Sequence, residues 1–466
     1  MTTIPYCDPD ACPAAACDPV ICTGRGVPSN ATLFARSAEA IPGGVNSSIR
    51  AFRAVGGEPY VVARAEGPYV WDVEGRRYVD LVQSYGAVIL GHAHPAITAA
   101  VRAAVGDGTS YGAPTPREMK LAETISARVP SCEQVRLMNS GTEATSTAVR
   151  LARGATGRDR IVTFHGNFHG ATDALLAAGG SGVATLGLPG TAGVPAGAVA
   201  ETLVVPYNEV PGLDDSVAAV IVEPIAANMG VVAPLPGFLA GLRAACDRAG
   251  ALLIFDEVIT GFRVDPGGAQ AVHDVRPDLT TFGKVIGGGL PIGAVGGRRD
   301  LMETLSPLGP VFHAGTLAGN PVATAAGLAA LGELTADSYV ELLARSRRLA
   351  AVLRDACDAA AFPARFPVAS TLAGIVCGPV GSPGQSTVSR SPRNFAEAKQ
   401  TDEQAYAAFF RAMLDEGVAM APGAYEAIFV GLAHTDEVIE EIASAAERAA
   451  GRAARNLGLT APTVVP

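Results

Sequence analysis

A lysine and a strand-end carboxylate are the two groups in this chain whose types and spacing could do chemistry together. Lys284 closes the segment Thr281–Lys284 and stands three residues before the triplet Gly287–Gly289. Twenty-eight residues before Lys284, the apolar run Ala251–Phe255 ends in Asp256. An apolar run of that length, rich in β-forming residues and closed by acidic residues, predicts a buried parallel strand. Open α/β sheets place ligand-binding groups at the carboxyl ends of such strands, so both groups are predicted to lie there.

A lysine amine and a carboxylate in these places would suit pyridoxal 5′-phosphate (PLP). The amine can form a Schiff base with the cofactor. The carboxylate can keep the pyridine nitrogen protonated, so that the ring accepts electrons from the reacting carbon. A surface lysine beside glycines would give the same local pattern, so this interpretation needs support from the rest of the chain.

A phosphate site is predicted where another strand runs into a helix. The strand Val135–Met138 leads through an asparagine into Ser140, Gly141 and Thr142, which begin a helical stretch. Free N–H groups and the helix dipole at such a terminus favour a phosphate, and the two hydroxyls add donors. An ordinary serine or threonine cap with a glycine turn is the other interpretation. Gly315–Asn320 is a second hydroxyl-bearing loop of small residues ahead of a helix.

Composition and charge describe a packed globular protein. Of the 466 residues, 48% are hydrophobic and 17% are charged, which is not the composition of a disordered chain. Lys and Arg total 35 against 45 for Asp and Glu, and the net charge of −10 argues against nucleic acid or an anionic membrane as a partner. No apolar stretch approaches the roughly 20 residues of a membrane span, and the amino terminus lacks a signal-peptide layout. We therefore expect a cytoplasmic enzyme.

The eight cysteines fall into two groups. Residues 1–28 are predicted to be a flexible leader rich in Cys, Pro and Ala. Its evenly spaced thiols could bind zinc or an iron–sulfur cluster, but the spacing matches neither kind of site, and no metal is predicted. The others are predicted to be ordinary buried thiols. The leader holds Cys7, Cys12, Cys17 and Cys22, and the rest of the chain holds Cys132, Cys246, Cys357 and Cys377.

Residues 29–94 are predicted to form an amino-terminal segment of one helix and short strands. The helix is expected over Ser29–Ala40, with Ser29 or Asn30 as its cap, and it stops at a Pro-Gly-Gly turn. We expect this segment to pack with a small domain at the end of the chain. Its strands are predicted around Tyr60–Ala63, Tyr69–Asp72 and Tyr78–Leu81.

Alternating strands and helices predict a large domain over residues 95–335. Helices such as Pro116–Val129 and Phe238–Ala249 separate apolar strands, which implies a mainly parallel sheet covered on both faces. Residues 336–466 are predicted to form a smaller α+β domain. The strand candidates of the large domain are Gln134–Met138, Arg160–Phe164, Ala218–Val222, Leu252–Phe255 and Ile292–Val295.

These segments together resemble the class III, fold-type I family of PLP-dependent aminotransferases, and within it most of all the glutamate-1-semialdehyde 2,1-aminomutases. The likeness covers roughly Leu33 to Ala449. It implies an α/β fold with a large PLP-binding domain and a smaller α+β domain. Six motifs in chain order bear it: Ile41–Phe52, Gly91–Pro95, Asn139–Thr145, Phe255–Arg263, Thr281–Gly293 and Ala314–Pro321.

The resemblance implies how the cofactor is held. Lys284 would form the Schiff base and carry a proton between substrate and cofactor carbons, and Asp256 would hold the pyridine nitrogen. Thr316 would reach the phosphate in a neighbouring subunit, so a homodimer with shared active sites is expected. The other cofactor contacts would come from Ser140, Gly141, Thr142, Phe168 and His169, with the Phe168 ring stacked on the cofactor.

The resemblance also implies a small amino acid or keto acid as substrate. Arg50, with Ser47, matches the place that receives the substrate carboxylate, a task for which a guanidinium is well suited. Glu426 matches an active-site acid. Tyr85 and Asn228 are expected on the wall of the substrate pocket.

The first functional hypothesis is PLP-dependent amino-group transfer within one molecule, from glutamate-1-semialdehyde to 5-aminolevulinate, as in tetrapyrrole biosynthesis. Such a mutase starts from the pyridoxamine form of the cofactor and must keep a free diamine from escaping. The glycine-rich stretch Gly179–Pro195 matches the mobile lid of the aminomutases, and a closed lid retains the diamine and excludes water.

The alternative is a related class III aminotransferase that moves nitrogen between two molecules, with a β- or ω-amino acid or a specialised metabolite as substrate. It rests on Tyr85, Phe168 and Ala227, which stand where the aminomutase pattern has tryptophan, tyrosine and glycine. A hydrogen bond lost from a pocket wall can change selectivity by orders of magnitude. A non-catalytic binding module is a third hypothesis, and the presence of both Lys284 and Asp256 speaks against it.

Overall fold

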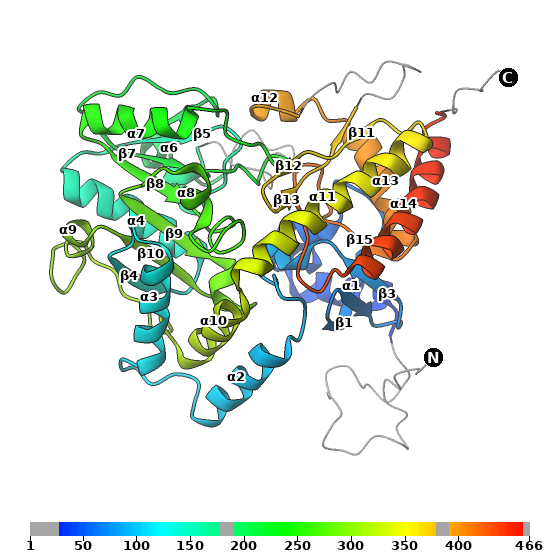
Figure 1. The fold of residues 1–466 in the computed structure, drawn as a ribbon, viewed down its shortest axis with the longest axis horizontal. Coiled ribbons are helices and arrows are strands. Elements are labelled where there is room, and N and C mark those ends of the chain that lie inside the picture. The colour runs from blue at the N-terminus through cyan, green and yellow to red at the C-terminus, as the bar shows by residue number, and fades with distance from the viewer. Residues whose placement is uncertain (1–27, 178–190, 379–390, 460–466) are drawn as a thin grey trace.

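The chain folds into two unequal halves (Figure 1). This computed structural model describes residues 28–177, 191–378 and 391–459. One half holds a large sheet wrapped by helices. The other gathers short strands around three helices, α11 (Ala336–Ala359), α13 (Glu403–Asp415) and α14 (Asp436–Asn456). The predicted cysteine leader lies outside the described residues, except for its last residue.

The large half is built on one seven-stranded sheet of order β4-β10-β9-β8-β7-β5-β6. Only β10 runs antiparallel to its two neighbours, and the other neighbouring strands pair in parallel. The predicted α/β class with a mainly parallel sheet is therefore confirmed. The strands are β4 (Gln134–Met138), β5 (Arg160–Phe164), β6 (Thr202–Val205), β7 (Val217–Val222), β8 (Leu252–Asp256), β9 (Leu279–Gly283) and β10 (Gly293–Gly297).

Helices cover both faces of this sheet because its central strands are apolar along their whole length. On β7, Ile221 packs in one cluster with residues of α4 (Gly141–Thr156). Its neighbour Val220 faces the other way, in a cluster with residues of α7 (Phe238–Ala249). Each such side chain contributes roughly 1.5–3 kcal/mol when it is fully buried.

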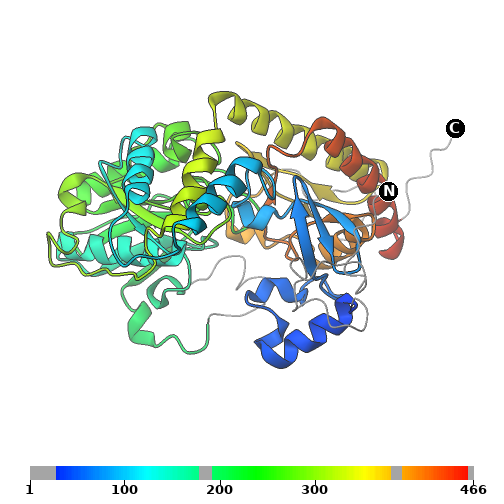
Figure 2. The ribbon, with the colours of Figure 1, turned by 90° about the horizontal axis from the view of Figure 1, so that it is seen from below.

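The amino-terminal segment is tied to a separate four-stranded sheet. Ser29 caps α1 (Asn30–Ala40) by accepting a hydrogen bond from the Thr32 N–H, as predicted. The Asn30 side chain donates to Asp72 at 3.0 Å and accepts from the Val61 N–H at 2.7 Å. Figure 2 shows α1 at one edge of the molecule, next to the strands that follow it. The sheet has the order β1 (Val62–Glu66), β2 (Tyr69–Asp72), β3 (Arg77–Asp80), β15 (Val418–Ala419).

Because β15 pairs in parallel with β3, this sheet joins the amino-terminal segment to the carboxyl-terminal part of the chain. The division of the chain after residues 94 and 335 stays a prediction.

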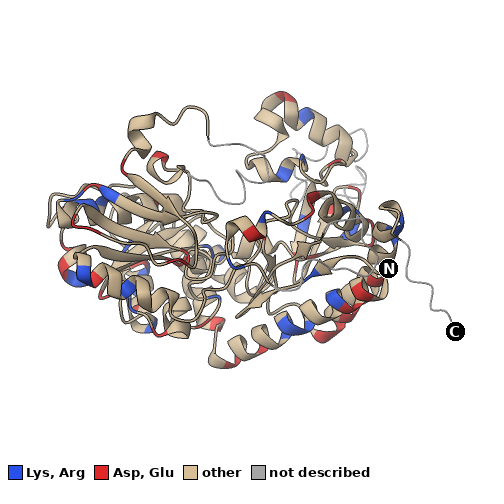
Figure 3. Cartoon of the chain, turned by 90° about the horizontal axis from the view of Figure 1, so that it is seen from above, with Lys and Arg blue, Asp and Glu red and all other residues tan. Residues whose placement is uncertain are grey.

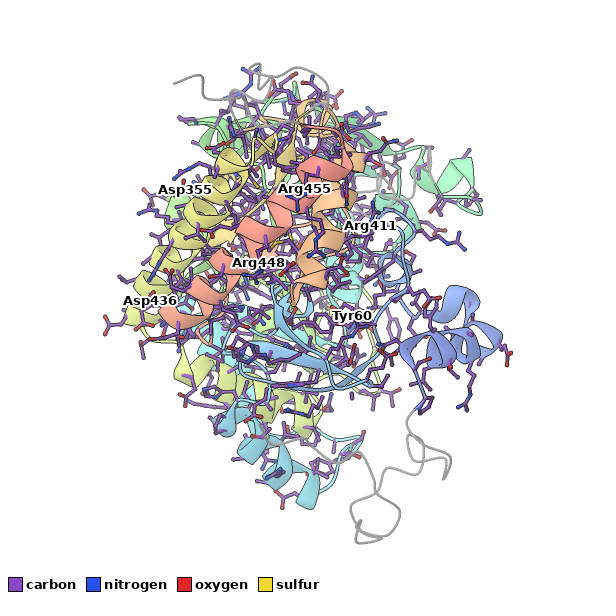
Figure 4. The ribbon with its side chains drawn as sticks, turned by 90° about the vertical axis from the view of Figure 1, so that its right-hand side faces the viewer. Tyr60, Asp355, Arg411, Asp436, Arg448 and Arg455 are labelled. Atoms are coloured by element: carbon purple, nitrogen blue, oxygen red, sulfur yellow. The ribbon has the colours of Figure 1, made fainter. Side chains whose placement is uncertain are left out.

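Three long helices cover the outside of the smaller half. Figure 4 shows α14 lying between α11 and α13, with Asp436 near one end and Arg448 near its middle. Arg448 donates to Glu416 at 2.6 Å, which ties α14 to the end of α13. Charges of both signs are interspersed on the outer helices (Figure 3), where pairs such as Arg345–Glu341, at 2.9 Å, link successive turns.

A run of left-handed residues follows β3. Gln83, Ser84, Tyr85 and Gly86 have φ values of 46, 50, 56 and 98°. The left-handed region costs a non-glycine residue roughly 1–2 kcal/mol, so the surrounding structure must hold the three side-chain-bearing residues there. Part of that support comes from Asp80, whose carboxylate accepts from the Gln83 N–H at 3.2 Å and whose carbonyl accepts from Gln83 Nε2 at 3.0 Å.

The same corner contains a buried histidine, and we predict that it makes stability depend on pH. His434 Nδ1 accepts from the Gly431 N–H at 3.0 Å, so Nε2 carries the proton and donates to the Asp80 carbonyl at 3.2 Å. Burial lowers the pKa of His434 from 6.5 to about 4, although Asp80 opposes this shift. The unfolded chain therefore binds the extra proton first. The stabilisation is complete above pH 6.5 and is lost as the pH falls towards 4, by about 3 kcal/mol in all.

The thermal midpoint of the wild type, measured from pH 7.5 down to 4.5, should fall more steeply than that of His434→Gln. Glutamine can accept and donate hydrogen bonds without titrating. Equal slopes for the two proteins would show that His434 does not carry this pH dependence.

The sequence missed two strands of the large sheet, β6 and β9. The first predicted strand of the amino-terminal segment also begins later than expected, at Val62. Within the described ranges, none of the helices combines the length and apolar character that a membrane span requires. The same ranges contain no group of three His, Cys, Asp or Glu residues that could hold a metal. The four described cysteines are buried free thiols, as predicted.

Candidate active site

A cavity of about 430 Å³ opens at the carboxyl ends of the parallel strands. It is lined mostly by the segments that follow β4, β5, β7, β8 and β9. It brings together eight of the predicted site residues: Ser140, Gly141, Thr142, Phe168, His169, Asn228, Asp256 and Lys284. Residues more than 140 positions apart in the sequence thus form one site.

Lys284 stands directly after β9, on the cavity wall. Its φ of 46° is left-handed, a strained conformation of the kind that collects at functional sites. Burial lowers the pKa of Lys284 to about 8, while Glu426, Glu223 and Asp256 act in the opposite direction. A much larger fraction of this amine is therefore neutral near pH 8 than for an ordinary lysine, and the neutral amine is the form that attacks a carbonyl group or accepts a proton.

Asp256 ends β8 and faces Thr281 of β9 across the parallel ladder. Its Oδ1 accepts from the Thr281 hydroxyl at 3.0 Å and from the Val258 N–H at 3.1 Å. Its Oδ2 lies 2.6 Å from Nδ1 of His169, which is buried like Asp256 itself. Because Nδ1 faces a carboxylate, it carries a proton and donates it. Nε2 of the same ring is buried with no hydrogen-bond partner in the structure.

The amino terminus of α4 forms the other end of the cavity. Ser140 is its cap and accepts from the Glu143 N–H at 3.2 Å, while the N–H groups of the first turn have no partner within the helix. Gly170 packs so closely on this turn that a Cβ there would lie 2.5 Å from the Thr142 hydroxyl. The turn is thus a close-fitting concave surface of N–H and hydroxyl donors, which suits a phosphate.

Sequence reasoning missed Glu223 and Asn167. Glu223 follows β7, is buried, and accepts from the N–H groups of Phe168 at 2.7 Å and Ala227 at 2.9 Å. Asn167 accepts from the Glu223 N–H at 2.9 Å, so the pair fixes the backbone beside Phe168. Burial raises the pKa of Glu223, and His169 opposes the shift. The signal was present in the sequence, since Glu223 closes an apolar strand just as Asp256 does.

Three of the predicted substrate residues, Arg50, Tyr85 and Glu426, lie near one another. Burial raises the pKa of Tyr85, the charge of Glu426 raises it further, and Arg50 lowers it, so these three side chains lie within electrostatic reach of one another. Glu426 also raises the pKa of Lys284, so the acid lies within electrostatic reach of both the tyrosine and the lysine. Glu426 is buried, Tyr85 and Ser47 are half-buried, and Arg50 is exposed. None of these four lines the cavity itself.

Thr316 does not reach the cavity of its own chain. It lies exposed on the loop before α10 (Pro321–Glu333). Large apolar side chains around it are also exposed, among them Phe312 at 68% and Leu317 at 52%. A role for Thr316 at a phosphate would therefore require a second subunit.

Comparison with known proteins gives the family. The model of the class III aminotransferases matches residues 52–445. A glutamate-1-semialdehyde 2,1-aminomutase of Cutibacterium acnes is 51% identical over 439 residues, which cover 92% of this chain and 99% of that protein. A protein of the same name from Bordetella avium is 50% identical over 428 residues, covering 90% and 98%.

Solved structures of a transaminase and of an aminomutase resemble this chain over most of its length. An omega-transaminase from Sphaerobacter thermophilus has a TM-score of 0.81 at 31% identity, over 93% of this chain and 99% of that one. A glutamate-1-semialdehyde aminomutase from Pseudomonas aeruginosa PAO1 has a TM-score of 0.78 at 25% identity, over 91% and 94%.

The chain belongs to the class III aminotransferases, and it is a PLP-dependent enzyme of fold type I. The site fits this cofactor. It combines a concave, donor-rich helix terminus with a cavity-lining lysine and a carboxylate whose histidine partner has an unsatisfied ring nitrogen.

Proposed function

We propose that this enzyme is a glutamate-1-semialdehyde 2,1-aminomutase, which moves an amino group within one substrate to give 5-aminolevulinate. The observation that carries the proposal is the position of Lys284. Its amine stands in one cavity with Asp256, Glu426 lies within electrostatic reach of it, and Tyr85 lies within electrostatic reach of Glu426. Two relatives that bear this name share about half of their residues with the chain, which adds support.

In the proposed mechanism, Ser140, Gly141 and Thr142 would bind the phosphate of the cofactor, and the Phe168 side chain would stack on the cofactor. His169 holds the Asp256 carboxylate in place, and that carboxylate would keep the pyridine nitrogen of the cofactor protonated. The bound cofactor supplies a ring that accepts electrons from the substrate carbon. Lys284 Nζ would accept a proton from one of the two carbons bonded to the transferred nitrogen and return it to the other.

Asn228 and Glu426 are proposed to orient the substrate. Glu426 is buried, and its charge acts on Lys284. A polar substrate group that binds next to both side chains would therefore be held by both. Most of the predicted lid, Gly179–Pro195, lies outside the described residues, and its closure stays a prediction.

A related aminotransferase that uses a separate amino donor is the second candidate. Tyr85, Phe168 and Ala227 favour it, because they change the wall beside the cofactor relative to the aminomutase pattern. Phe168 is 40% exposed and has no hydroxyl that could bind a substrate. The likeness to an omega-transaminase also fits this candidate.

One incubation separates the two candidates. The enzyme, loaded with the amine form of the cofactor, is given glutamate-1-semialdehyde without an amino donor, and 5-aminolevulinate is followed together with the cofactor absorbance. Sustained turnover is the expected result for a mutase. A single turnover that stops in the aldehyde form, or none at all, would favour the second candidate and call for a screen of amino donors.

A prediction for Arg50 tests the proposed carboxylate contact. Arg50→Ala should raise KM roughly 10- to 100-fold, because a charge-assisted hydrogen bond is lost, and kcat should change less. Arg53→Ala is a matched control, since Arg53 is also exposed and lies one turn further along the chain. Steady-state kinetics decide the matter, and an unchanged KM for Arg50→Ala would mean that the carboxylate binds elsewhere.

A homodimer is proposed, in which Thr316 of one copy completes the phosphate site of the other. The exposed Phe312 and Leu317 next to it support this assembly, since a partner would cover them. The cytoplasm is the proposed location of the reaction.

A further inference from the structure

Arg263 is a buried cation that the mechanism above does not use. Its side chain is 0% exposed, and it forms no ion pair with a carboxylate among the residues that the structure describes. Burial lowers the pKa of Arg263 to about 10, which reflects the cost of keeping its charge away from water. A charge kept at such a cost calls for an explanation beyond the stability of the fold.

All hydrogen bonds of this guanidinium end on main-chain carbonyl groups. Nη2 donates to the Gly86 carbonyl at 2.7 Å and Nε to the same oxygen at 3.3 Å. Nη1 donates to the Val430 carbonyl at 3.2 Å, and the guanidinium lies 5.3 Å from the centre of the Phe429 ring. Arg263 itself follows the strand that carries Asp256. One side chain therefore connects three distant stretches of the chain, each of which carries a residue of the proposed site.

The first contact closes the left-handed run that contains Tyr85. Asp80 holds the beginning of this run through Gln83, and Arg263 holds its end through Gly86. Gly86 has no room for a side chain, because a Cβ there would lie 2.8 Å from the Phe429 ring and 3.3 Å from Arg263 Nε. The position of the Tyr85 backbone is thus set from both ends.

The second contact holds the strand β16 (Ile428–Phe429), which follows Glu426. Tyr85 packs against the cluster that includes Ala427 and Phe429. Arg263 binds the Gly86 carbonyl next to Tyr85 and the Val430 carbonyl after Glu426. It therefore fixes the tyrosine and the acid relative to each other.

We propose that Arg263 is a positioning residue, which sets the Tyr85 and Glu426 wall of the substrate site relative to Lys284. The proposal rests on the proposed function only in that Tyr85 and Glu426 face the substrate. It requires an amino-transfer substrate with polar groups, and it does not depend on whether the transfer is intramolecular.

The test is a double-mutant cycle on the loaded enzyme, with whichever amino substrate the wild type turns over. Arg263→Met is expected to raise KM about tenfold and to change kcat less, and the same substitution on a Tyr85→Ala background is expected to add little. Arg263→Lys keeps the charge but not the fork of donors, so it should recover part of the effect. Additive effects of the two substitutions would overturn the proposal.

A readout besides activity comes from the bound cofactor. Four charged groups act on Lys284, namely Glu426, Glu223 and Asp256, which raise its pKa, and Arg263, which lowers it. Removal of the cation in Arg263→Met should move the pH at which the cofactor absorbance changes to a higher value, and Arg263→Lys should not. An unmoved titration in Arg263→Met would count against the placement of Arg263 near this wall.

A matched control separates positioning from stability. Arg158 is a half-buried arginine that, like Arg263, donates to two main-chain carbonyls, those of Val217 at 3.0 Å and Ala249 at 2.8 Å. Arg158→Met should lower the thermal midpoint without a change in KM. If Arg263→Met does not fold, the cycle is run with Arg263→Lys, and additivity there overturns the proposal as well. The aminomutase proposal is tested by the wild type alone: it fails if the wild type turns over only with an added amino donor. That result leaves the test of Arg263 unaffected.

Discussion

Replacing Lys284 by alanine is expected to slow turnover by roughly 10²- to 10⁴-fold, the range that a positioned proton-transfer group contributes. The variant loses the amine that is proposed to attach the cofactor and move the proton. The phosphate site around Ser140 and Thr142 is untouched, so the cofactor should still be retained without a covalent link. The fold should tolerate the change, since an alanine at a φ of 46° is no more strained than the lysine.

The scarcity of lysine makes this experiment easy to control. The chain has three lysines, Lys120, Lys284 and Lys399, and the other two are exposed. Reduction with borohydride, followed by peptide mass spectrometry, should place the cofactor on Lys284 in the wild type and nowhere in Lys284→Ala. Lys120→Ala should behave like the wild type. Wild-type turnover in Lys284→Ala would refute the assignment of this residue.

Asp256→Asn is expected to lower kcat roughly 10²- to 10³-fold, because a preorganised charge at the reacting centre is lost while the shape of the side chain is kept. The structure explains why the substitution should lower activity and leave the local fold intact. The Asp256 Oδ1 bonds from Thr281 and Val258 can be made equally well by the amide oxygen. The other position becomes an N–H₂ group facing Nδ1 of His169, so the histidine must move its proton to Nε2.

Two measurements test the Asp256→Asn variant. Steady-state kinetics should show a fall in kcat, and the thermal midpoint should stay within a few degrees of the wild type. Thr281→Val is the matched control, because it removes one hydrogen bond to Asp256 and leaves the carboxylate charged. A Thr281→Val variant as impaired as Asp256→Asn would mean that the orientation of the carboxylate matters more than its charge.

The strand that carries Lys284 shows where sequence reasoning falls short. β9 reads Leu-Thr-Thr-Phe-Gly, and Thr280 and Thr281 interrupt the apolar pattern that identifies a buried strand. Both threonines are nonetheless 0% exposed. Thr281 donates to Asp256, and Thr280 accepts from Gln270 at 3.3 Å, so each hydroxyl has a buried partner from another element. Such a partner is invisible until the neighbouring strand is in place.

The substrate side could be predicted only in part for the same reason. The family resemblance implied a pocket with Arg50, Tyr85 and Glu426, but the segments of Tyr85 and Glu426 meet only through long-range contacts such as those of Arg263. Nothing local in Phe255–Arg263 indicates that its last residue lies buried against carbonyl groups more than 150 positions away on either side of it in the sequence. Long-range packing supplies that information.

The sequence by itself determined the chemistry. The apolar strand ending in Asp256, the Ser140–Thr142 turn and Lys284 are local signals, because strand burial, helix capping and nucleophile identity depend on residues close together in the chain. Only the tertiary structure decided the environment of these groups. It placed His169 2.6 Å from Asp256, lowered the pKa of Lys284 to about 8 and set Arg263 behind the Tyr85 turn. Burial and electrostatics are sums over neighbours that the chain brings together only when it folds.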